Sequence, residues 1–325
     1  MKINQVSSSS NAQEKLNAML AFILAQFKVF QIMEFALEPS TFSAYPVLAD
    51  VSASPGSVRL VNAALESFVF APNASSGSLK MYGFENKIDK LYLNDLKIGA
   101  KAPEGLRRQI ETEQIRLAKK VAYDVLYDMI NGDGTNGAIY GFKNLVKDVA
   151  DASGQAAYLG LTTAQIHASL VRVAQRLDLT DKAALRAFEE ILTRELADMA
   201  SPALIMNNSM FARMTSVAKE LGAYTVETND FGKQIDKFGN IPMVAVPLAI
   251  LPQSETDGAS SDLSSIYGVE FSEVDGFRYA TNGGFDFTDF EWTEAQPQGK
   301  GRFEFYGQTK IEDMKKFKRF SRIGL

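Results

Sequence analysis

The strongest constraint in this sequence is a helical pattern that runs from Pro103 to Asn131. Pro103 suits a first helical turn, where its missing N–H is not needed, and Gly132 suits the position after the last turn. Such a helix is about 43 Å long at 1.5 Å per residue, so it must cross a whole domain. Its apolar residues recur at the spacing of one helix face: Leu106, Ile110, Leu117, Val121, Val125 and Met129.

A second constraint is the apolar stretch from Leu16 to Leu37. A membrane span needs about 20 consecutive, mostly apolar residues, and polar residues such as Lys28 and Glu34 interrupt this one. A signal peptide also fits poorly, because a serine run separates the lone Lys2 from the apolar segment. We therefore expect a buried apolar helix in an N-terminal arm. Its cover is either its own domain or a neighbouring subunit.

Residues 58–100 change in character and favour β-structure. Short runs rich in β-branched and aromatic residues alternate there with turn-forming segments such as Pro72–Gly77. We expect these runs to form a long β-hairpin that projects from the domain. A two-stranded ribbon is marginally stable alone in water, so the hairpin needs another surface to lie on.

The second half of the chain mixes helices and strands, which indicates an α+β fold class. Two helices are expected over residues 163–177 and 181–199, and a third over 210–221 that stops at Gly222. Short strands are expected at 203–206, 241–246, 265–269, 276–280, 285–288 and 301–306.

The composition excludes several classes of function. The 325 residues contain no cysteine and a single histidine, His167. Disulfide scaffolds, thiolate zinc sites, iron–sulfur clusters, cysteine nucleophiles and histidine-pair metal sites are therefore impossible. The net charge of −5 argues against a general polyanion binder, which needs a strongly basic face.

The few residues with catalytic potential have simpler structural explanations. His167 follows a Thr162–Gln165 capping box at the edge of an apolar helical stripe, and the chain has no nucleophile-elbow motif. The carboxylates between Asp286 and Glu294 alternate with aromatic residues, as in a strand with one wet face. A soluble enzyme using His167 or these carboxylates is the alternative from another class. The sequence predicts no cofactor and no metal.

A glycine motif lies after the long helix. Gly132, Gly134 and Gly137 match the spacing of a dinucleotide-binding fingerprint. That fingerprint must leave a strand and open a helix, whereas this one follows a helix C-terminus, where the dipole repels phosphate. The match therefore does not favour a nucleotide site.

Residues 310–325 form the one conspicuous basic cluster in the sequence. They include six cationic side chains and two anionic ones, with Phe317 and Phe320 between them. Basic and aromatic residues interleave in this way in single-strand nucleic-acid binders, but an amphipathic segment with solvated lysines gives the same pattern. Both interpretations stay open.

The order of these elements resembles the major capsid protein of tailed bacteriophages, which has the HK97-type fold. The β-prone region takes the place of the extended E-loop, and the long helix takes that of the spine helix. The run Asn131-Gly-Asp-Gly-Thr-Asn-Gly137, followed by Tyr140-Gly141-Phe142, is similar to the family's junction after that helix. Later strands and a helix of the family resemble Ala203–Asn207, Met210–Leu221, Phe238–Val246 and Gly301–Lys310.

This resemblance implies a division into five segments. They are an N-terminal arm with an apolar helix (1–57), an extended β-hairpin or E-loop (58–100), a peripheral domain with the spine helix (101–150), a mainly axial domain (151–284) and C-terminal strands that return to the peripheral domain (285–325). Removing residues 1–37 is expected to leave a folded chain that fails to assemble. Contacts between subunits are expected at Phe22, Phe27, Leu79, Tyr82, Lys87, Lys90 and Tyr92.

The resemblance also implies a function. Subunits of this family assemble into pentamers and hexamers of an icosahedral shell that encloses double-stranded DNA, without a catalytic site. A separate scaffolding protein, a portal and a decoration protein are the implied partners, with no membrane involved. The implied location is the virion, after assembly in the host cytoplasm. An encapsulin-like shell around a protein cargo shares the fold and stays open as a second interpretation.

Overall fold

The computed structural model describes residues 27–37, 42–47, 73–78, 80–89, 102–135, 140–157, 161–178, 181–228, 234–256, 262–272, 276–281, 286–292, 298–311 and 313–324. The helices are α2 (Lys28–Ile32), α4 (Ala102–Asn131), α5 (Phe142–Leu145), η2 (Ala152–Gly154), α6 (Thr163–His167), α7 (Lys182–Glu195), α8 (Asn208–Leu221) and η3 (Met314–Lys316). The strands are β1 (Glu34–Leu37), β2 (Phe42–Val47), β3 (Asn73–Ser78), β4 (Lys80–Asp89), β5 (Leu170–Asp178), β6 (Pro202–Asn207), β7 (Tyr224–Thr228), β8 (Gln234–Phe238), β9 (Ile241–Val246), β10 (Leu263–Glu270), β11 (Phe277–Thr281), β12 (Asp286–Trp292), β13 (Gln298–Ile311) and β14 (Phe317–Gly324).

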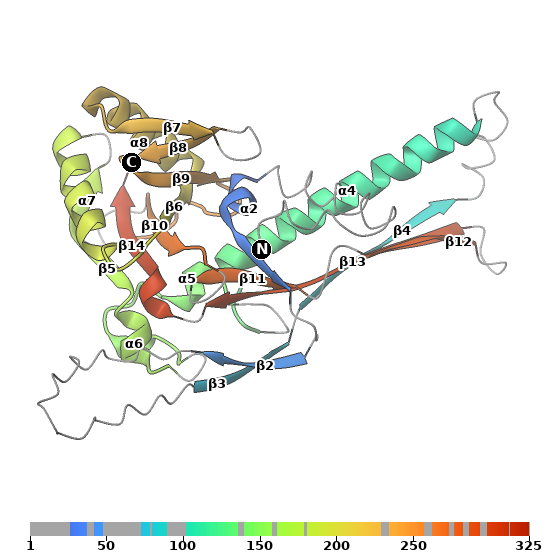
Figure 1. Cartoon of the computed structure of the whole chain (residues 1–325), viewed down its shortest axis with the longest axis horizontal. Coiled ribbons are helices and arrows are strands. Elements are labelled where there is room, and N and C mark those ends of the chain that lie inside the picture. The colour runs from blue at the N-terminus through green and yellow to red at the C-terminus, as the bar shows by residue number, and fades with distance from the viewer. Residues whose placement is uncertain are drawn as a thin grey trace, which may run out of the picture.

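The long helix α4 is confirmed almost to the residue. It begins at Ala102 and ends at Asn131, and it crosses the molecule diagonally in Figure 1. The apolar face of its C-terminal half is in the core, where seven residues are at most 3% exposed: Ala118, Val121, Ala122, Val125, Leu126, Met129 and Ile130. Burial of this face, rather than intrinsic helix propensity, stabilises the helix.

A five-stranded sheet lies alongside α4. Its strand order is β1-β11-β13-β12, and β4 lies on the other edge of β13. Residues 299–304 of β13 therefore have β12 on one side and β4 on the other. The strands predicted at 276–280, 285–288 and 301–306 are confirmed as parts of this sheet, and β13 is longer than its sequence pattern indicated.

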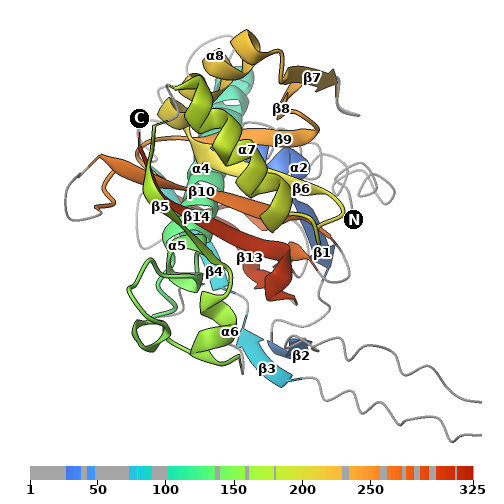
Figure 2. The same cartoon turned by 90° about the vertical axis from the view of Figure 1, so that its left-hand side faces the viewer.

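A seven-stranded sheet forms the other half of the subunit, in the order β5-β14-β10-β6-β9-β8-β7. Its third strand, β10, is buried along its whole length. The helices α7 and α8 cover one face, as Figure 2 shows for α7, and the Phe188 ring meets that of Phe320 at 5.7 Å. Both helices match their predictions, with caps from Asp181 and Asn207 and a left-handed Gly222 after α8.

One expectation about secondary structure is wrong. The helix predicted over 163–177 ends at His167, and residues 170–178 form β5, which pairs in parallel with β14. Val171 and Val173 favour a strand, and the open edge of β14 supplies the partner that an isolated pattern lacks.

The hairpin expected over 58–100 lies largely outside the described residues. Of its described strands, β3 pairs with β2 and β4 pairs with β13.

The end of α4 is tied to the next segment by a compact turn. The Gly141 N–H donates to the Gly132 carbonyl at 2.8 Å, and the Asn144 side-chain amide donates to the same carbonyl at 2.9 Å. A Cβ on Gly141 would lie 2.6 Å from the Gly132 nitrogen, so only glycine fits there. Gly134 has φ of +74° with the Tyr140 ring against it. Gly132 and Gly134 are therefore part of a packed region, while Gly137 lies outside the described residues.

That turn places Phe142 between the two sheets. Its ring lies 4.8 Å from that of Phe277 on β11, 5.4 Å from that of Tyr267 on β10 and 5.2 Å from that of Phe317 on β14. Phe142, Tyr267 and Phe317 are each fully buried. This aromatic cluster joins both sheets and α5 into one hydrophobic core.

A buried cation lies beside the aromatic cluster. Arg319, on β14, is 2% exposed and donates to Ser265 Oγ at 2.9 Å and to the carbonyls of Lys143 and Val146 at 2.9 and 2.6 Å. Its Nη2 forms an ion pair with the Glu255 carboxylate. Burial alone would lower the pKa of Arg319, but Tyr267 and Glu255 reverse the shift, so the guanidinium stays charged.

These contacts revise both interpretations of the basic cluster at 310–325. Phe317 and Phe320 are fully buried and Lys310 is 4% exposed, so these aromatic rings offer no stacking platform for bases. The alternative of an amphipathic segment with solvated lysines fits only in part, because β14 is buried along most of its length while Lys315 is exposed.

The described part of the N-terminal arm, residues 27–37, contacts both sheets. Val29 and Phe30 of α2 are fully buried, and Lys28 Nζ lies 2.8 Å from the Asp236 carboxylate on β8. The next residues form β1, which pairs in parallel with β11 of the five-stranded sheet. Removal of residues 1–37 is therefore expected to destabilise the fold, contrary to the expectation from the sequence, because Val29, Phe30 and Met33 are buried and β1 pairs with β11.

Replacing Arg319 with methionine is expected to lower the free energy of unfolding by about 3–5 kcal/mol, because Glu255 would remain buried without its cation. Arg302→Met is the control, since that side chain is 65% exposed, and its effect should stay within about 0.5 kcal/mol. Urea unfolding followed by tryptophan fluorescence measures both. Equal effects of the two substitutions would contradict the proposed importance of Arg319.

Asp148 makes the free energy of unfolding depend on pH in the acidic range. Burial alone would raise the pKa of Asp148, but hydrogen bonds from Arg172 at 2.7 Å and Arg322 at 3.3 Å lower it overall. A carboxyl with a lowered pKa in the folded state stabilises the fold above its usual pKa of about 3.9, and this contribution is lost as pH falls below that value. Between pH 6 and pH 3 we expect the wild type to lose more unfolding free energy than Asp148→Asn. The same loss in both proteins would contradict the assignment.

Candidate assembly surface

An arm extends from the body of the subunit. It consists of α4, β4, β12 and residues 298–307 of β13, which run together away from the seven-stranded sheet in Figure 1. Lys120 on α4 lies with its Nζ 4.6 Å from the centre of the Phe84 ring on β4. The arm is thus a helix laid along a three-stranded ribbon, and this packing supplies the second surface that a ribbon alone would lack.

A single carboxylate on α4 fixes β4 to the helix. Asp128 accepts a hydrogen bond from the Tyr82 hydroxyl at 2.8 Å and forms an ion pair with Lys80. Lys80 Nζ also lies 5.0 Å from the centre of the Tyr82 ring. Because alternate residues of a strand share a face, Lys80, Tyr82 and Phe84 all point toward α4.

Aromatic rings fill the space between the ribbon and the helix. The rings of Tyr279 and Phe305 are stacked at 5.9 Å with 9° between their planes, and the Tyr82 ring lies 6.3 Å from that of Phe305. Burial raises the pKa of Tyr82, and the nearby Tyr279 and Asp128 raise it further. Tyr82 therefore stays protonated and neutral at physiological pH, where its hydroxyl donates to Asp128.

The opposite face of the ribbon points to solvent. Met81 is 56% exposed there, and four residues further along β4 Glu85 forms an ion pair with Arg302, with the closest atoms 3.8 Å apart. Tyr306 donates to Glu304 at 3.1 Å on the same face. An exposed apolar side chain among charged groups of both signs has the chemistry of a protein contact surface rather than of a reaction site.

The structure separates the residues that were expected to contact other subunits. Phe27 packs partly buried in its own subunit, with its ring 5.9 Å from that of Phe30, and Tyr82 is 5% exposed. Lys87 lies on β4 opposite Lys300. Phe22, Leu79, Lys90 and Tyr92 lie outside the described residues.

The residues proposed for catalysis are not brought together. His167 is half-buried at the end of α6, with Nε2 3.3 Å from the Val149 carbonyl oxygen. Asp286, Asp289 and Glu291 lie on β12, and Glu294 lies outside the described residues. Within the described ranges no group of three or more carboxylate or histidine side chains could hold a metal ion, and no helix is long and apolar enough to cross a membrane.

Sequence reasoning missed the two charged residues that organise the arm and the core. Asp128 lies next to the apolar face of α4, but the sequence does not show that a strand some fifty residues earlier brings two donors to it. Arg319 was counted as part of a basic cluster. Phe317, Phe320 and Ile323 recur there every three residues rather than in alternation, so the sequence carries no period-two signal of a buried strand.

Comparison with known proteins gives a consistent result for the fold alone. No protein-family model matches the chain, and no curated protein matches it. Among solved structures, the capsid of a native GTA particle is 14% identical, covers 91% of this chain and 89% of its own, and has a TM-score of 0.57. The holo-SrpI encapsulin complex from Synechococcus elongatus is 12% identical, with 91% and 87% coverage and a TM-score of 0.56.

A third similar structure comes from the capsid of Myoviridae phage XM1, at 9% identity, 94% and 92% coverage and a TM-score of 0.51. Capsid and encapsulin chains share the HK97-like fold, and this chain has the same α+β fold. The expectation about the fold is therefore confirmed.

Asp128→Ala tests how the arm is held together. The Tyr82 hydroxyl would lose its carboxylate acceptor while still buried, and we expect a loss of about 1–3 kcal/mol in unfolding free energy. The control is Asp124→Ala, one turn earlier on α4, which removes only an exposed pair with Lys120 at 3.2 Å and should cost about 0.5 kcal/mol or less. Thermal unfolding compares them, and a larger effect of Asp124→Ala would contradict the role of Asp128.

Proposed function

We propose that this protein is the subunit of a closed shell, a major capsid protein that self-assembles into pentamers and hexamers of an icosahedral particle. The observation that carries this proposal is the fold itself, which extends over about nine-tenths of this chain and of the capsid and encapsulin chains similar to it. No catalytic step is part of the proposal. The scattered positions of His167 and the β12 carboxylates support a structural role over an enzymatic one.

The shape of the subunit supports assembly on physical grounds. The arm presents Met81 at 56% exposure and Tyr127 at 45% exposure, and contact with a neighbouring subunit would remove this apolar surface from water. We assign the peripheral domain to residues 101–150 and the mainly axial domain to 151–284. Residues 1–57 are the N-terminal arm and residues 58–100 the E-loop, and both would contact neighbouring subunits. In the segment 285–325, β12 and β13 belong to the five-stranded sheet, while β14 belongs to the seven-stranded sheet.

The content of the shell has two candidate answers. Enclosed double-stranded DNA, with a separate scaffolding protein, a portal and a decoration protein, agrees with the similarity to the GTA and phage XM1 capsids. A protein cargo agrees with the similarity to the encapsulin, whose TM-score is nearly the same. We favour DNA and a location in the virion after assembly in the host cytoplasm. Nuclease-resistant DNA in purified particles is the expected result, and particles that hold only protein would favour the encapsulin-like alternative.

Assembly can be tested on the outward face of the arm. Met81→Asp places a charge at an exposed site without disturbing Tyr82, so we expect a folded protein whose yield of particles falls at least tenfold. The control, Leu248→Asp, changes a residue of similar size that is 43% exposed and lies outside the arm. Electron microscopy and light scattering count the particles, and circular dichroism checks folding. Normal particle yield from Met81→Asp would contradict the role of this face.

Two truncations separate the role of residues 1–26 from that of residues 27–37. Deleting residues 1–26 is expected to leave the fold intact but to reduce assembly, whereas deleting residues 1–37 also removes buried Val29, Phe30 and strand β1 and should unfold the subunit. Light scattering and thermal unfolding report on the two effects separately. A stable fold without residues 27–37 would contradict their structural role.

A further inference from the structure

The β7–β8 hairpin at the end of the seven-stranded sheet has few backbone links to the rest of the subunit. β7 is the edge strand and pairs with β8, and four of its five residues are exposed. β8 pairs with β9 over three residues, Asp236–Phe238, and the middle partner is Pro242, which has no N–H to donate. Side-chain contacts therefore matter more for the position of this hairpin than for that of a central strand.

One carboxylate joins the hairpin to the N-terminal segment 27–37. Asp236 Oδ2 on β8 lies 2.8 Å from Lys28 Nζ on α2, and Asp236 Oδ1 accepts a hydrogen bond from the Tyr224 hydroxyl on β7 at 2.5 Å. Burial alone would raise the pKa of Asp236, but Lys28 and Tyr224 lower it overall, so the carboxylate is charged at neutral pH. The Lys28 ammonium also lies 5.8 Å from the centre of the Phe211 ring on α8. Lys28 is therefore the residue through which the N-terminal segment holds the hairpin.

This contact is more exposed than the residues that follow it in the chain. The Lys28 side chain is 44% exposed, whereas Val29 and Phe30 are fully buried and β1 pairs with β11. Phe27 and Lys28 can therefore leave the surface while the rest of the segment stays in the core. They also come first after residues 1–26, so a force on those residues acts on Phe27 and Lys28 before it acts on the buried part.

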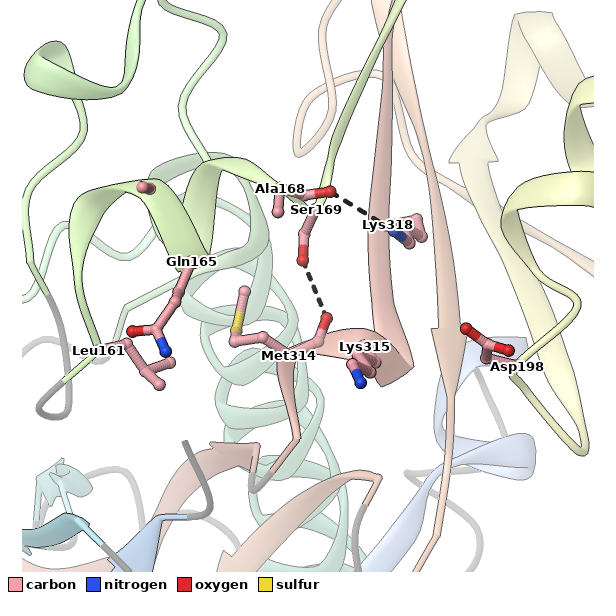
Figure 3. Close-up of a pocket in the computed structure, with 9 residues that line it drawn as sticks. Leu161, Gln165, Ala168, Ser169, Asp198, Met314, Lys315 and Lys318 are labelled. Carbon is pink, nitrogen blue, oxygen red and sulfur yellow. Dashed lines mark hydrogen bonds between the residues drawn. The ribbon is translucent and has the colours of Figure 1, made fainter. Parts of the chain in front are cut away.

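Another link between the two sheets is fixed more firmly. The chain passes from β13 to β14 through η3, and Figure 3 shows the Ser169 hydroxyl donating to the Met314 carbonyl there, at 2.9 Å. Lys316 of η3 lies 2.9 Å from Glu270 on β10, and the two side chains are 14% and 7% exposed. An exposed ion pair costs less to break than a buried one. Of these two links, the one through Lys28 is therefore the easier to release.

We propose that the contact between Lys28 and Asp236 couples the N-terminal segment to the β7–β8 hairpin. The hairpin is held while Lys28 lies on it and becomes more mobile when Lys28 is drawn away, because Tyr224, which also binds Asp236, belongs to the hairpin itself and does not anchor it. By linkage, displacing the hairpin loosens Lys28 to the same extent. The use of this device rests on the proposed shell, in which a neighbouring subunit that binds residues 1–26 would free the hairpin, with its exposed Val226, for a contact of its own.

Hydrogen exchange followed by mass spectrometry tests this coupling on the full chain, in the fraction that size-exclusion chromatography separates from particles. Lys28→Met removes the charge, and the amides of β7 and β8 should exchange about threefold faster, as expected for the loss of a partly exposed ion pair. The amides of β1 should keep their wild-type rates. Lys182→Met is the matched control, because it removes an exposed pair with Glu220 at 2.9 Å, and Lys28→Arg keeps the charge. Both should leave the hairpin unchanged.

Three results would overturn the proposal. They are unchanged exchange of the hairpin in Lys28→Met, the same acceleration in Lys182→Met, and equal acceleration of β1, which would mean that the segment leaves as a whole.

A double-mutant cycle tests whether the two residues act through one contact. Asp236→Asn keeps an acceptor for Tyr224 but loses the ion pair, so it should also accelerate exchange of the hairpin. The double variant with Lys28→Met should exchange no faster than Asp236→Asn alone, since both substitutions break the same contact. Effects that multiply would contradict the coupling. Electron microscopy of the same proteins counts particles, so a failure of the coupling and a failure of shell formation are separate results.

Discussion

The buried guanidinium of Arg319 lies at the point where α5, β10, β14 and the loop that carries Glu255 meet. Removing a cation from water costs several kcal/mol, and this cost is offset only when the partners are complete. Here Glu255, Ser265 and the carbonyls of Lys143 and Val146 provide them, from segments that are far apart in the sequence. The polar cluster therefore favours the one arrangement in which all these segments are in place.

The aromatic cluster around Phe142 works together with this polar one. Arg319 binds the carbonyls of Lys143 and Val146, so it fixes the short helix that carries Phe142. Phe142 then packs against residues of both sheets. Because the compact turn at Gly132 and Gly141 joins α4 to this helix, the direction of the arm is set by the core. The shell proposed above would require such a fixed direction, since contacts on the arm would have to match those of its neighbours.

Charge has opposite roles in the two halves of the molecule. Inside the core and under the arm, Arg319 and Asp128 fix elements relative to one another because their partners are buried or partly buried. On the outward face of the arm, the ion-paired side chains of Arg302 and Glu85 are 65% and 32% exposed. Exposed pairs contribute little to stability but select among partners. The residues that stabilise the subunit are thus distinct from those available for recognition.

The sequence by itself determined the elements whose signals are local. The span of α4, the capping box at Thr162 and the helix stop at Gly222 depend on residues within one or two turns, and the structure has them as predicted. Tertiary structure decided the rest, because strand pairing depends on a distant partner. Tyr82 is paired with Phe305, more than two hundred residues away, and the run after His167 is a strand only because β14 has an open edge beside it. The basic cluster was likewise ambiguous in the sequence, since burial of Arg319 requires partners that only the folded chain brings together.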